Sequence, residues 1–324
     1  MRFASFHVNG QDTYGVALSD KRIIDLRASG GSDVPANLLA FIESGESGLQ
    51  LAAEILQDPA AAETFDVDQI EWHPPVRRPG KICGVAMNNS ASNERKISAP
   101  DHPAFFLKPA SCMIGHKQPI EIRSYYGSVH PEPELAVVIG RAARDIDAAN
   151  AAEYIFGYTI FDDITGNGMR SEDLFQYYAL YSSDKDPGRL ERREQHLSYA
   201  GRYKGTDGFG AMGPWLVTCD EIPDPNNLRV TCKVGGEIVA EDSTRYYNYK
   251  VAEIVSFISQ FQTLHPGDVV SCGTAFKPSA DRKSIHHANL QTVDGPVEVS
   301  IEGLGTQENP VIRTKKDIGD WRLN

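Results

Sequence analysis

The sequence predicts a mixed α+β protein in which a small N-terminal α/β domain, residues 1–75, precedes a larger β-rich domain, residues 76–324. Residues 1–75 combine strand-like runs around an Asn-Gly turn with two helical segments. The stretch "WHPPVRRPGK", residues 72–81, is rich in proline, as is typical of a connector between domains. After it, short β-rich runs dominate.

The apolar pattern places the expected elements along the chain. In the first domain we expect strands near 1–8, 13–19 and 21–26 and helices near 37–45 and 48–57. In the second domain the expected helices are 147–155 and 250–264. The expected strands of that domain are 81–87, 104–109, 134–140, 156–164, 214–218, 229–236, 268–274 and 297–303.

Composition and charge limit the possible partners. The formal net charge of -12 argues against nucleic acid, because phosphate binding requires clustered Lys and Arg. No stretch approaches the roughly 18 unbroken apolar residues of a membrane span, so we expect no membrane partner. The start "MRFASFHVNGQDTYGV" shows no export signal, and we therefore expect a cytoplasmic protein.

The cysteines are typical of free thiols in a reducing compartment. They are odd in number, widely separated and without a C-x-x-C pair, which disfavours disulfides and zinc. A catalytic cysteine would need a neighbouring base, which the sequence does not show. The five are Cys83, Cys112, Cys219, Cys232 and Cys272.

Two glutamates stand at the start of an apolar run in "SVHPEPELAVVIG", residues 128–140. In an extended chain residues two apart share a face, so Glu132 and Glu134 would project side by side, with His130 on the same face. Like charges this close repel unless a cation lies between them or one is protonated. A divalent ion with oxygen ligands is one interpretation. The other is a strand end whose acids reach water.

A third acid is available in "GYTIFDDITG", where Asp162 and Asp163 end another β-like run. Neighbouring residues of a strand point to opposite faces, so one aspartate can face the glutamates while the other caps the following turn. Two glutamates and one aspartate would leave open positions around a six-coordinate Mg²⁺ or Mn²⁺. Such an arrangement is typical of a catalytic metal.

Seven ordered segments resemble the fumarylacetoacetate hydrolase family across residues 78–312. They are "KICGVAMNNSASNE", "PAFFLKPASCMIGHKQPI", "EPELAVVIG", "GYTIFDDITG", "YKGTDGFGAMGPWLVT", "HPGDVVSCGT" and "VEVSIEGLGTQENPV". The resemblance implies a mixed β-sandwich roll with a small N-terminal domain, a homodimer, and a divalent metal that binds a 2-oxo acid. The metal would be Mg²⁺, or Mn²⁺ or Ca²⁺. It implies that Glu132, Glu134 and Asp163 are the metal ligands.

Further site residues follow from the resemblance position by position. Lys204 in "KGTDGFGAMGP" matches the family's active-site lysine, whose ammonium could neutralise a substrate carboxylate or an enolate. Thr274 matches the family's Gly-Thr that contacts the substrate carboxylate. Asn167 takes the place of an arginine that is common in the family, with Arg170 nearby, and Arg170 and Asn88 complete the expected substrate-binding set. Lys108 in "FLKP" is expected to be structural.

The sequence departs from the family pattern in the segment after the first strand of the large domain. Hydrolytic members carry a His and Glu pair there, on a mobile lid that activates water. Here the stretch is "NNSASNERK", in which Ser92 takes the place nearest to the histidine and only Glu94 can serve as the acid. His102 and His130 are the histidines to test as replacements. Residues 170–204 are either a solvated insertion with a short helix or a lid.

These observations predict a metal-dependent enzyme that cleaves a C–C bond in an acylpyruvate-like 1,3-dioxo or 2-oxo carboxylic acid. Because the water-activating histidine is missing, a lyase of the same family is the alternative: a 2-oxo acid decarboxylase, dehydratase or isomerase. Lys204 and Glu94 could supply the acid and base. A non-catalytic relative that binds a metal and a 2-oxo acid is the third possibility.

Overall fold

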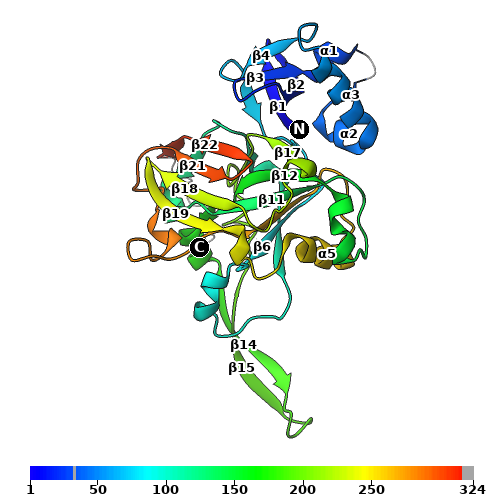
Figure 1. Cartoon of the computed structure of the whole chain (residues 1–324). Helices are drawn as coiled ribbons and strands as arrows, with labels where there is room; N and C mark the ends of the chain where they lie inside the picture. Colours follow the sequence, from blue (N-terminus) through cyan, green and yellow to red (C-terminus); the bar gives the residue numbers. More distant parts are fainter. Residues whose placement is uncertain (32–33, 316–324) are drawn as a thin grey trace.

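A small N-terminal unit and a larger β-rich body make up the computed structural model, which describes residues 1–31 and 34–315 (Figure 1). The N-terminal strands form consecutive antiparallel pairs, and the first two meet at a tight turn in which Asn9 and Gly10 both have positive φ. This is the Asn-Gly hairpin expected from the sequence. The elements of this unit are β1 (Arg2–Val8), β2 (Gln11–Ala17), β3 (Arg22–Asp25), α1 (Leu26–Gly30), α2 (Leu38–Glu43), α3 (Glu46–Gln57), β4 (Thr64–Asp66) and β5 (Glu71–His73).

The large sheet runs through both parts of the molecule. Its strand order is β4-β3-β2-β1-β17-β12-β11-β20-β6-β7, so that β1 of the N-terminal unit pairs with β17 of the body. Two short strands, β8 and β16, extend it at β12, and β5 pairs with β1. The body strands of this sheet are β6 (Ile82–Ala86), β7 (Ala104–Lys108), β8 (Met113–Ile114), β11 (Pro133–Ile139), β12 (Ile155–Asp162), β16 (Gly210–Met212), β17 (Leu216–Thr218) and β20 (Val269–Thr274).

Smaller sheets and helices complete the body. A four-stranded antiparallel sheet contains β19 (Glu237–Ser243), β18 (Arg229–Val234), β21 (Val297–Ile301) and β22 (Gly305–Asn309), in that order. Two two-stranded sheets pair β10 (Val129–His130) with β13 (Thr165–Gly166) and β9 (Ile120–Arg123) with β23 (Val311–Thr314). The helices are α4 (Asn167–Glu172) and α5 (Val251–Phe261), with 3₁₀ turns η2 (Ser90–Arg95), η3 (Ala110–Cys112), η4 (Ser124–Tyr126), η5 (Ala148–Tyr154), η6 (Cys219–Glu221), η7 (Thr244–Tyr246) and η8 (Ile285–His287).

The central strand β11 is covered on both faces, as its unbroken apolar sequence predicts. Leu135 and Val137 pack into one core together with side chains of the four-stranded sheet, such as Val230. Ala136 and Val138 point the other way, into a second core that includes α2 of the N-terminal unit. Because successive residues alternate between faces, a single strand joins the two layers. The mixed α+β fold is confirmed.

Residues 170–204, expected to be a solvated insertion with a short helix or a lid, contain a long β-hairpin. It is formed by β14 (Leu174–Ser182) and β15 (Leu190–Ser198), which pair only with each other among the described residues and project from the body (Figure 1). The expected short helix is present just before it, as α4. The hairpin has no clean alternation of apolar and polar residues, because neither of its faces is buried.

Other expectations agree in part. The segment expected as a helix near 147–155 forms the 3₁₀ turn η5, whereas 250–264 contains the α-helix α5. Four cysteines are buried and free, and Cys219 is free and exposed. In the described parts of the chain, no helix has the length and apolar character needed to cross a membrane.

The shared core predicts that the N-terminal unit and the body depend on each other for stability. Phe3 is fully buried, and its ring centroid lies 4.9 Å from that of Phe41 in α2 and 6.0 Å from that of Phe156 in β12. We therefore expect Phe3→Ala to lower the free energy of unfolding by about 3–5 kcal/mol, because it leaves a cavity between the two parts. Urea unfolding measures this, with Leu18→Ala, at an exposed side chain, as the control. A loss below about 1 kcal/mol would contradict the shared core.

Candidate metal centre and active site

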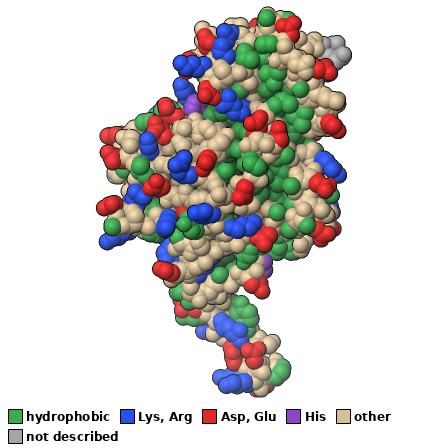
Figure 2. Space-filling model, in the orientation of Figure 1, with side chains coloured by type: hydrophobic (Ala, Val, Ile, Leu, Met, Phe, Trp, Pro, Cys, Tyr) green, Lys and Arg blue, Asp and Glu red, His purple; other side chains and the backbone are tan. Residues whose placement is uncertain are grey.

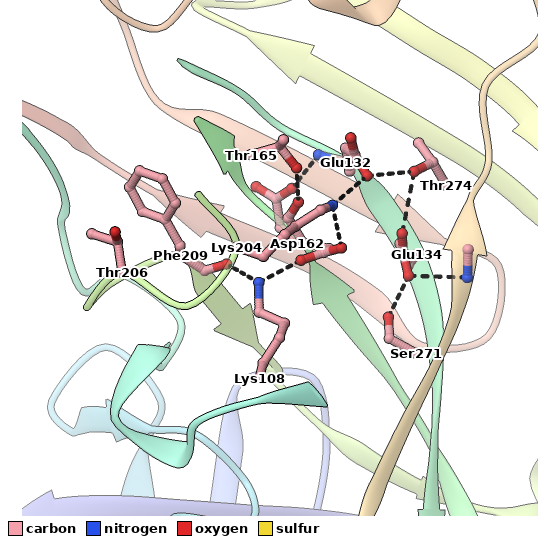
Figure 3. Close-up of polar contacts among 12 residues, drawn as sticks. Lys108, Glu132, Glu134, Asp162, Thr165, Lys204, Thr206, Phe209, Ser271 and Thr274 are labelled. Atoms are coloured by element: carbon pink, nitrogen blue, oxygen red, sulfur yellow. Dashed lines mark hydrogen bonds and ion pairs between the residues drawn. The ribbon is translucent and has the colours of Figure 1, made fainter. Parts of the chain in front are cut away.

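Three carboxylates meet where strands β11 and β12 end side by side. Glu134 lies in β11 and Glu132 directly before it, while Asp163 directly follows β12. The antiparallel register pairs Pro133 with Asp162, which brings the acids to one edge of the sheet. One ligand atom from each of the three acids lies within 4.8 Å of the others. The structure thus brings together the three residues that the sequence predicts as metal ligands, of which Glu132 and Glu134 are labelled in Figure 3.

Hydrogen-bond donors from β20 hold Glu134 in place. Its Oε2 atom accepts from the Ser271 hydroxyl at 2.5 Å and from the Gly273 backbone N–H at 3.0 Å (Figure 3). Gly273 has φ +105°, and a Cβ there would lie 2.7 Å from the Cβ of Asn88, so this position requires glycine. The Thr274 hydroxyl lies 2.8 Å from Glu132 Oε2 and 3.2 Å from Glu134 Oε1. Thr274 therefore links the two glutamates.

Two lysine ammonium groups contact the acid cluster from the opposite side. Lys204 Nζ lies 2.9 Å from Glu132 Oε2 and 2.5 Å from Asp163 Oδ2. Lys108 Nζ pairs with the other oxygen of Asp163 and donates to the Phe209 carbonyl at 2.9 Å. Burial alone would lower the pKa of Lys204, but the carboxylates of Asp163 and Glu132 raise it above its usual value. Lys204 is therefore a cation held inside the site.

Asp162 turns away from the three acids and supports the chain in front of β11. Its Oδ1 atom accepts from the Glu132 backbone N–H at 2.7 Å, so it braces the strand start and does not cap the following turn. Its Oδ2 atom is buried without a hydrogen-bond partner among the described residues. Burial raises the pKa of Asp162 to about 7. The structure thus places a fourth carboxyl group beside the cluster.

The charges of the site fit a divalent cation. The site contains four carboxyl groups, Glu132, Glu134, Asp162 and Asp163, and two ammonium groups, Lys108 and Lys204, so full ionisation of the carboxyl groups would leave two more negative than ammonium charges. Burial, and then the neighbouring Asp163, raises the pKa of Glu134 to about 8, which reflects this excess. Burial alone would raise the pKa of Glu132 as well, but Lys204 and His130 hold it well below its usual range. Oxygen ligands and a net charge of minus two suit Mg²⁺ or Mn²⁺.

A cavity of about 250 Å³ opens beside the acid cluster. Glu132 contributes to its wall, so the cluster meets the cavity at this residue. The three predicted substrate-binding residues, Asn88, Arg170 and Thr274, also line it. The remaining lining residues are Met87, Asn89, Ser92, Arg95, Phe276, Ile285 and His286.

Asn88 lines this cavity, but its amide group is engaged by the backbone. Its Nδ2 donates to the carbonyls of Tyr249 and Cys272 at 3.0 and 2.8 Å, and its Oδ1 accepts from the Tyr249 N–H at 2.8 Å. These bonds join the start of the lid segment to Cys272 in β20 and to Tyr249, which lies just before α5. Arg170, by contrast, lies with its guanidinium carbon 5.8 Å from the ring centroid of Tyr203.

The lid segment forms the 3₁₀ turn η2. Ser92, at the place nearest to the family's histidine, is buried, and its hydroxyl donates to the Asn89 carbonyl at 2.6 Å. Glu94 is exposed and is not among the residues that line the cavity. His102 stacks on Phe257 and lines a separate cavity of about 500 Å³. The role expected for Glu94 as acid or base stays a prediction.

His286 lines the cavity and contacts the buried His130. The rings of His130 and His286 have centroids 4.4 Å apart, and His130 Nε2 lies 3.0 Å from Glu132 Oε1. His286 is exposed as a whole residue, but partial desolvation of its ring, and then the neighbouring His130, lowers its pKa to about 4. The sequence does not mark His286 or Arg95 as site residues. They lie in η8 and in η2, far from the three acids along the chain. No periodic pattern marks either residue.

A second group of possible ligands lies on the N-terminal unit. His7 Nδ1 and His73 Nε2 lie 2.8 and 3.0 Å from Asp12 Oδ1, and Arg77 Nη1 lies 2.5 Å from Asp12 Oδ2. The Arg77 hydrogen bond, followed by those of the histidines, holds the pKa of Asp12 well below its usual value. The guanidinium of Arg77, in the connector at residues 72–81, already supplies positive charge to Asp12. We therefore interpret this group as a link between the connector and the N-terminal sheet, and not as a metal site.

Comparison with known proteins places the chain in a family. The model of the fumarylacetoacetate (FAA) hydrolase C-terminal domain matches residues 81–312. The mitochondrial oxaloacetate tautomerase fahd2 of Xenopus laevis is 31% identical over 300 residues, which cover 92% of this chain and 85% of that protein.

Solved structures share the fold. The 5-carboxymethyl-2-hydroxymuconate delta-isomerase from Mycobacterium smegmatis superposes with a TM-score of 0.67 at 26% identity, covering 98% of this chain and 100% of that one. Maleylpyruvate hydrolase from Sphingobium sp. SYK-6, solved with manganese(II) ion and pyruvate, has a TM-score of 0.71 at 23% identity, covering 97% and 100%. The family match extends over most of the chain and includes the acid cluster and Lys204, and the chain therefore belongs to the fumarylacetoacetate hydrolase family.

Proposed function

We propose that this protein is a metal-dependent enzyme that moves a proton at the carbon next to the 2-oxo group of a small dicarboxylic 2-oxo acid, as in the keto–enol tautomerisation of oxaloacetate. The observation that carries the proposal is a complete acid cluster beside a lid segment without a water-activating pair. Ser92 is bonded to the backbone and Glu94 is exposed. Tautomerisation needs an electron sink and a proton-transfer group but no activated water. Sequence relatives that share most of their length with this chain are named as oxaloacetate tautomerases.

The acid cluster is the proposed metal site. Glu132, Glu134 and Asp163 would hold the ion, with the charge excess described above as the physical reason. When bound, Mg²⁺ or Mn²⁺ supplies Lewis-acid polarisation of the 2-oxo group, which makes the hydrogens on the neighbouring carbon more acidic. The manganese in the maleylpyruvate hydrolase structure agrees with this choice of ion.

Positively charged side chains around the cavity would favour a negatively charged substrate. Arg95 and Arg170 line the cavity together with Glu132. Lys204 contacts Glu132, which forms part of the cavity wall, and its ammonium would stabilise negative charge that develops on an enolate oxygen. Two guanidinium groups in a cavity of about 250 Å³ suit a small acid with a second carboxylate.

His286 is the proposed proton-transfer group. It lines the cavity, and with a pKa of about 4 its imidazole is neutral at pH 7 and can accept a proton. Its contact with His130, which is in turn paired with Glu132, fixes the position of the ring. Glu94, the acid or base predicted from the sequence, is the rival for this role.

Hydrolysis of an acylpyruvate-like C–C bond is the second candidate. The fold similarity to maleylpyruvate hydrolase supports it, and so does the retention of Lys204. Hydrolysis requires a base that activates water, and His286 would have to supply it. The expected homodimer and the expected cytoplasmic location stay predictions.

Metal binding is expected to release a proton from Glu134. A carboxyl group with a pKa of about 8 is mostly protonated at pH 7 in the metal-free protein and must ionise to bind the ion. Apparent Mn²⁺ affinity should therefore rise about tenfold per pH unit below pH 8 and level off above it. Calorimetry at pH 7 in buffers of different ionisation enthalpy should report release of about one proton. Equal affinity at pH 6 and pH 8 would refute the assignment of Glu134.

Removal of Lys204 should damage turnover and spare metal binding. We expect Lys204→Met to lower kcat by about 10² to 10³, the loss typical of one group that stabilises an oxyanion. Mn²⁺ affinity should be unchanged or higher, because this ammonium competes for Glu132 and Asp163. Lys117→Met, at an exposed lysine, is the matched control. A variant that loses Mn²⁺ binding would show that Lys204 organises the site instead.

The proton-transfer group can be identified by comparing His286→Gln with Glu94→Gln. Enol-to-ketone conversion of oxaloacetate, followed by ultraviolet absorbance with Mg²⁺ present, should fall about 10² to 10⁴-fold in His286→Gln and change little in Glu94→Gln. The reverse pattern would assign the role to Glu94. The native protein should release no pyruvate from an acylpyruvate. Efficient hydrolysis without tautomerisation would overturn the proposed function in favour of the second candidate.

A further inference from the structure

The hairpin β14–β15 exposes several large apolar side chains. Nine residue pairs join its strands, from Leu174 with Ser198 to Ser182 with Leu190. Figures 1 and 2 show it projecting from the body as a narrow arm. A two-stranded hairpin is marginally stable in water unless something packs against it. We call residues 174–198 the arm.

The two strands of the arm differ in chemistry. β14 reads "LFQYYALYS" and has no charged residue, whereas β15 contains the four consecutive charges of "ERRE", residues 191–194. Phe175, Tyr178 and Leu180 on β14 are 59%, 65% and 61% exposed. Charges along an edge strand prevent pairing with another chain, and a long apolar edge permits it. The free edge of β14 is thus the one suited to pairing.

Contacts within the arm hold its shape without covering this edge. The Arg193 guanidinium carbon lies 4.8 Å from the ring centroid of Tyr181, and Arg193 also contacts Asp184 and Glu191 near the tip. The Ser183 hydroxyl donates to Glu191 at 2.6 Å. Among the described residues, no other strand pairs with β14. Its outward backbone N–H and C=O groups remain available.

Charge indicates what pairs with this edge. The arm contains four acidic residues (184, 186, 191 and 194) and four basic residues (185, 189, 192 and 193), so its formal charge is zero, while the whole chain carries -12. Two copies of an acidic body repel each other, but their neutral arms do not. A two-fold axis would bring the same apolar edge of each copy together, and such a surface is complementary to itself in antiparallel pairing.

We propose that the arm is an assembly element in which β14 pairs antiparallel with β14 of a second copy of this chain. The result is a four-stranded sheet, with the charged β15 strands outermost and the tyrosines of β14 stacked across the two-fold axis. Aromatic cross-strand pairs stabilise such a sheet, and tyrosine is enriched at interfaces between proteins. This assignment does not depend on the proposed reaction.

Pairing of the arms would also act on the active site. Arg170 lies shortly before β14 and Lys204 shortly after β15, so both ends of the arm enter the site. At its base Arg202 pairs with Glu172 and Asp173, each at 2.8 Å. An arm fixed by a second copy would hold these two cations in place. We therefore expect disruption of arm pairing to lower kcat through Lys204 and to raise KM through Arg170.

A cysteine scan tests the pairing directly. Single cysteines replace each of residues 176–180 in a Cys219→Ser background, since Cys219 is the exposed native cysteine and the other four are buried. In antiparallel two-fold pairing, the residue nearest the axis faces its own copy at a distance that a disulfide can span. Under mild oxidation we expect covalent dimers that peak at one of these positions. Arg192→Cys on β15 is the matched control and should give none above background.

Molar mass in solution provides the second measurement. Tyr178→Glu combined with Leu180→Glu places like charges along the paired edge, and sedimentation equilibrium should then show half the native molar mass. Arg192→Glu with His196→Glu, at two exposed positions of β15, adds the same kind of charge to that strand and should keep the native mass. Near-ultraviolet circular dichroism confirms that each variant is folded. An unchanged mass in the β14 variant, a monomeric native protein, or cross-links equally strong on both strands would overturn the proposal.

Discussion

Repulsion between buried carboxyl groups is the constraint on which the site depends. Glu134 and Asp163 are almost completely buried, and Glu132 and Asp162 lie beside them. Desolvation of four carboxyl groups is unfavourable unless positive charge and hydrogen-bond donors compensate. Lys108, with its pairing to Asp163 and to a backbone carbonyl, supplies part of this compensation.

The sheet order explains how the donors reach the acids. β11 lies between β12 and β20, so Glu134 has Asp163 on one side and the donors of β20 on the other. The β11–β20 register shifts between Glu134 and Ala136, and irregularities of this kind are common next to active sites. The central strand that joins the two cores therefore also places the ligands. Segments outside the large sheet add Arg95 in η2, His286 in η8 and the arm.

Much of this arrangement could be predicted from the sequence. Residues two apart at the start of an apolar strand point to the same side, so the sequence predicts that the carboxylates of Glu132 and Glu134 lie side by side, as they do in the structure. The meeting of Asp163 and Lys204 with them depends on contacts between distant segments, and only the family resemblance indicated it. The sequence does not predict the contact of His286 with His130, because it depends on a 3₁₀ turn packed against β10, and no local pattern encodes that contact. The insertion is exposed to solvent, as one of the two alternatives predicts, but its hairpin could not be predicted, since a strand with two exposed faces has no apolar alternation.

The central claim is that buried negative charge in this protein is matched by one divalent ion. Crystals grown with Mn²⁺ and oxalate, a stable mimic of a 2-oxo acid enolate, would test it by anomalous scattering at the manganese edge. We expect one strong peak among the carboxylates of Glu132, Glu134 and Asp163, with oxalate completing the coordination and the Lys204 ammonium facing the oxalate. A peak at His7, Asp12 and His73 in place of this site, or an acid cluster without manganese and with Lys204 still paired to Glu132, would contradict the account.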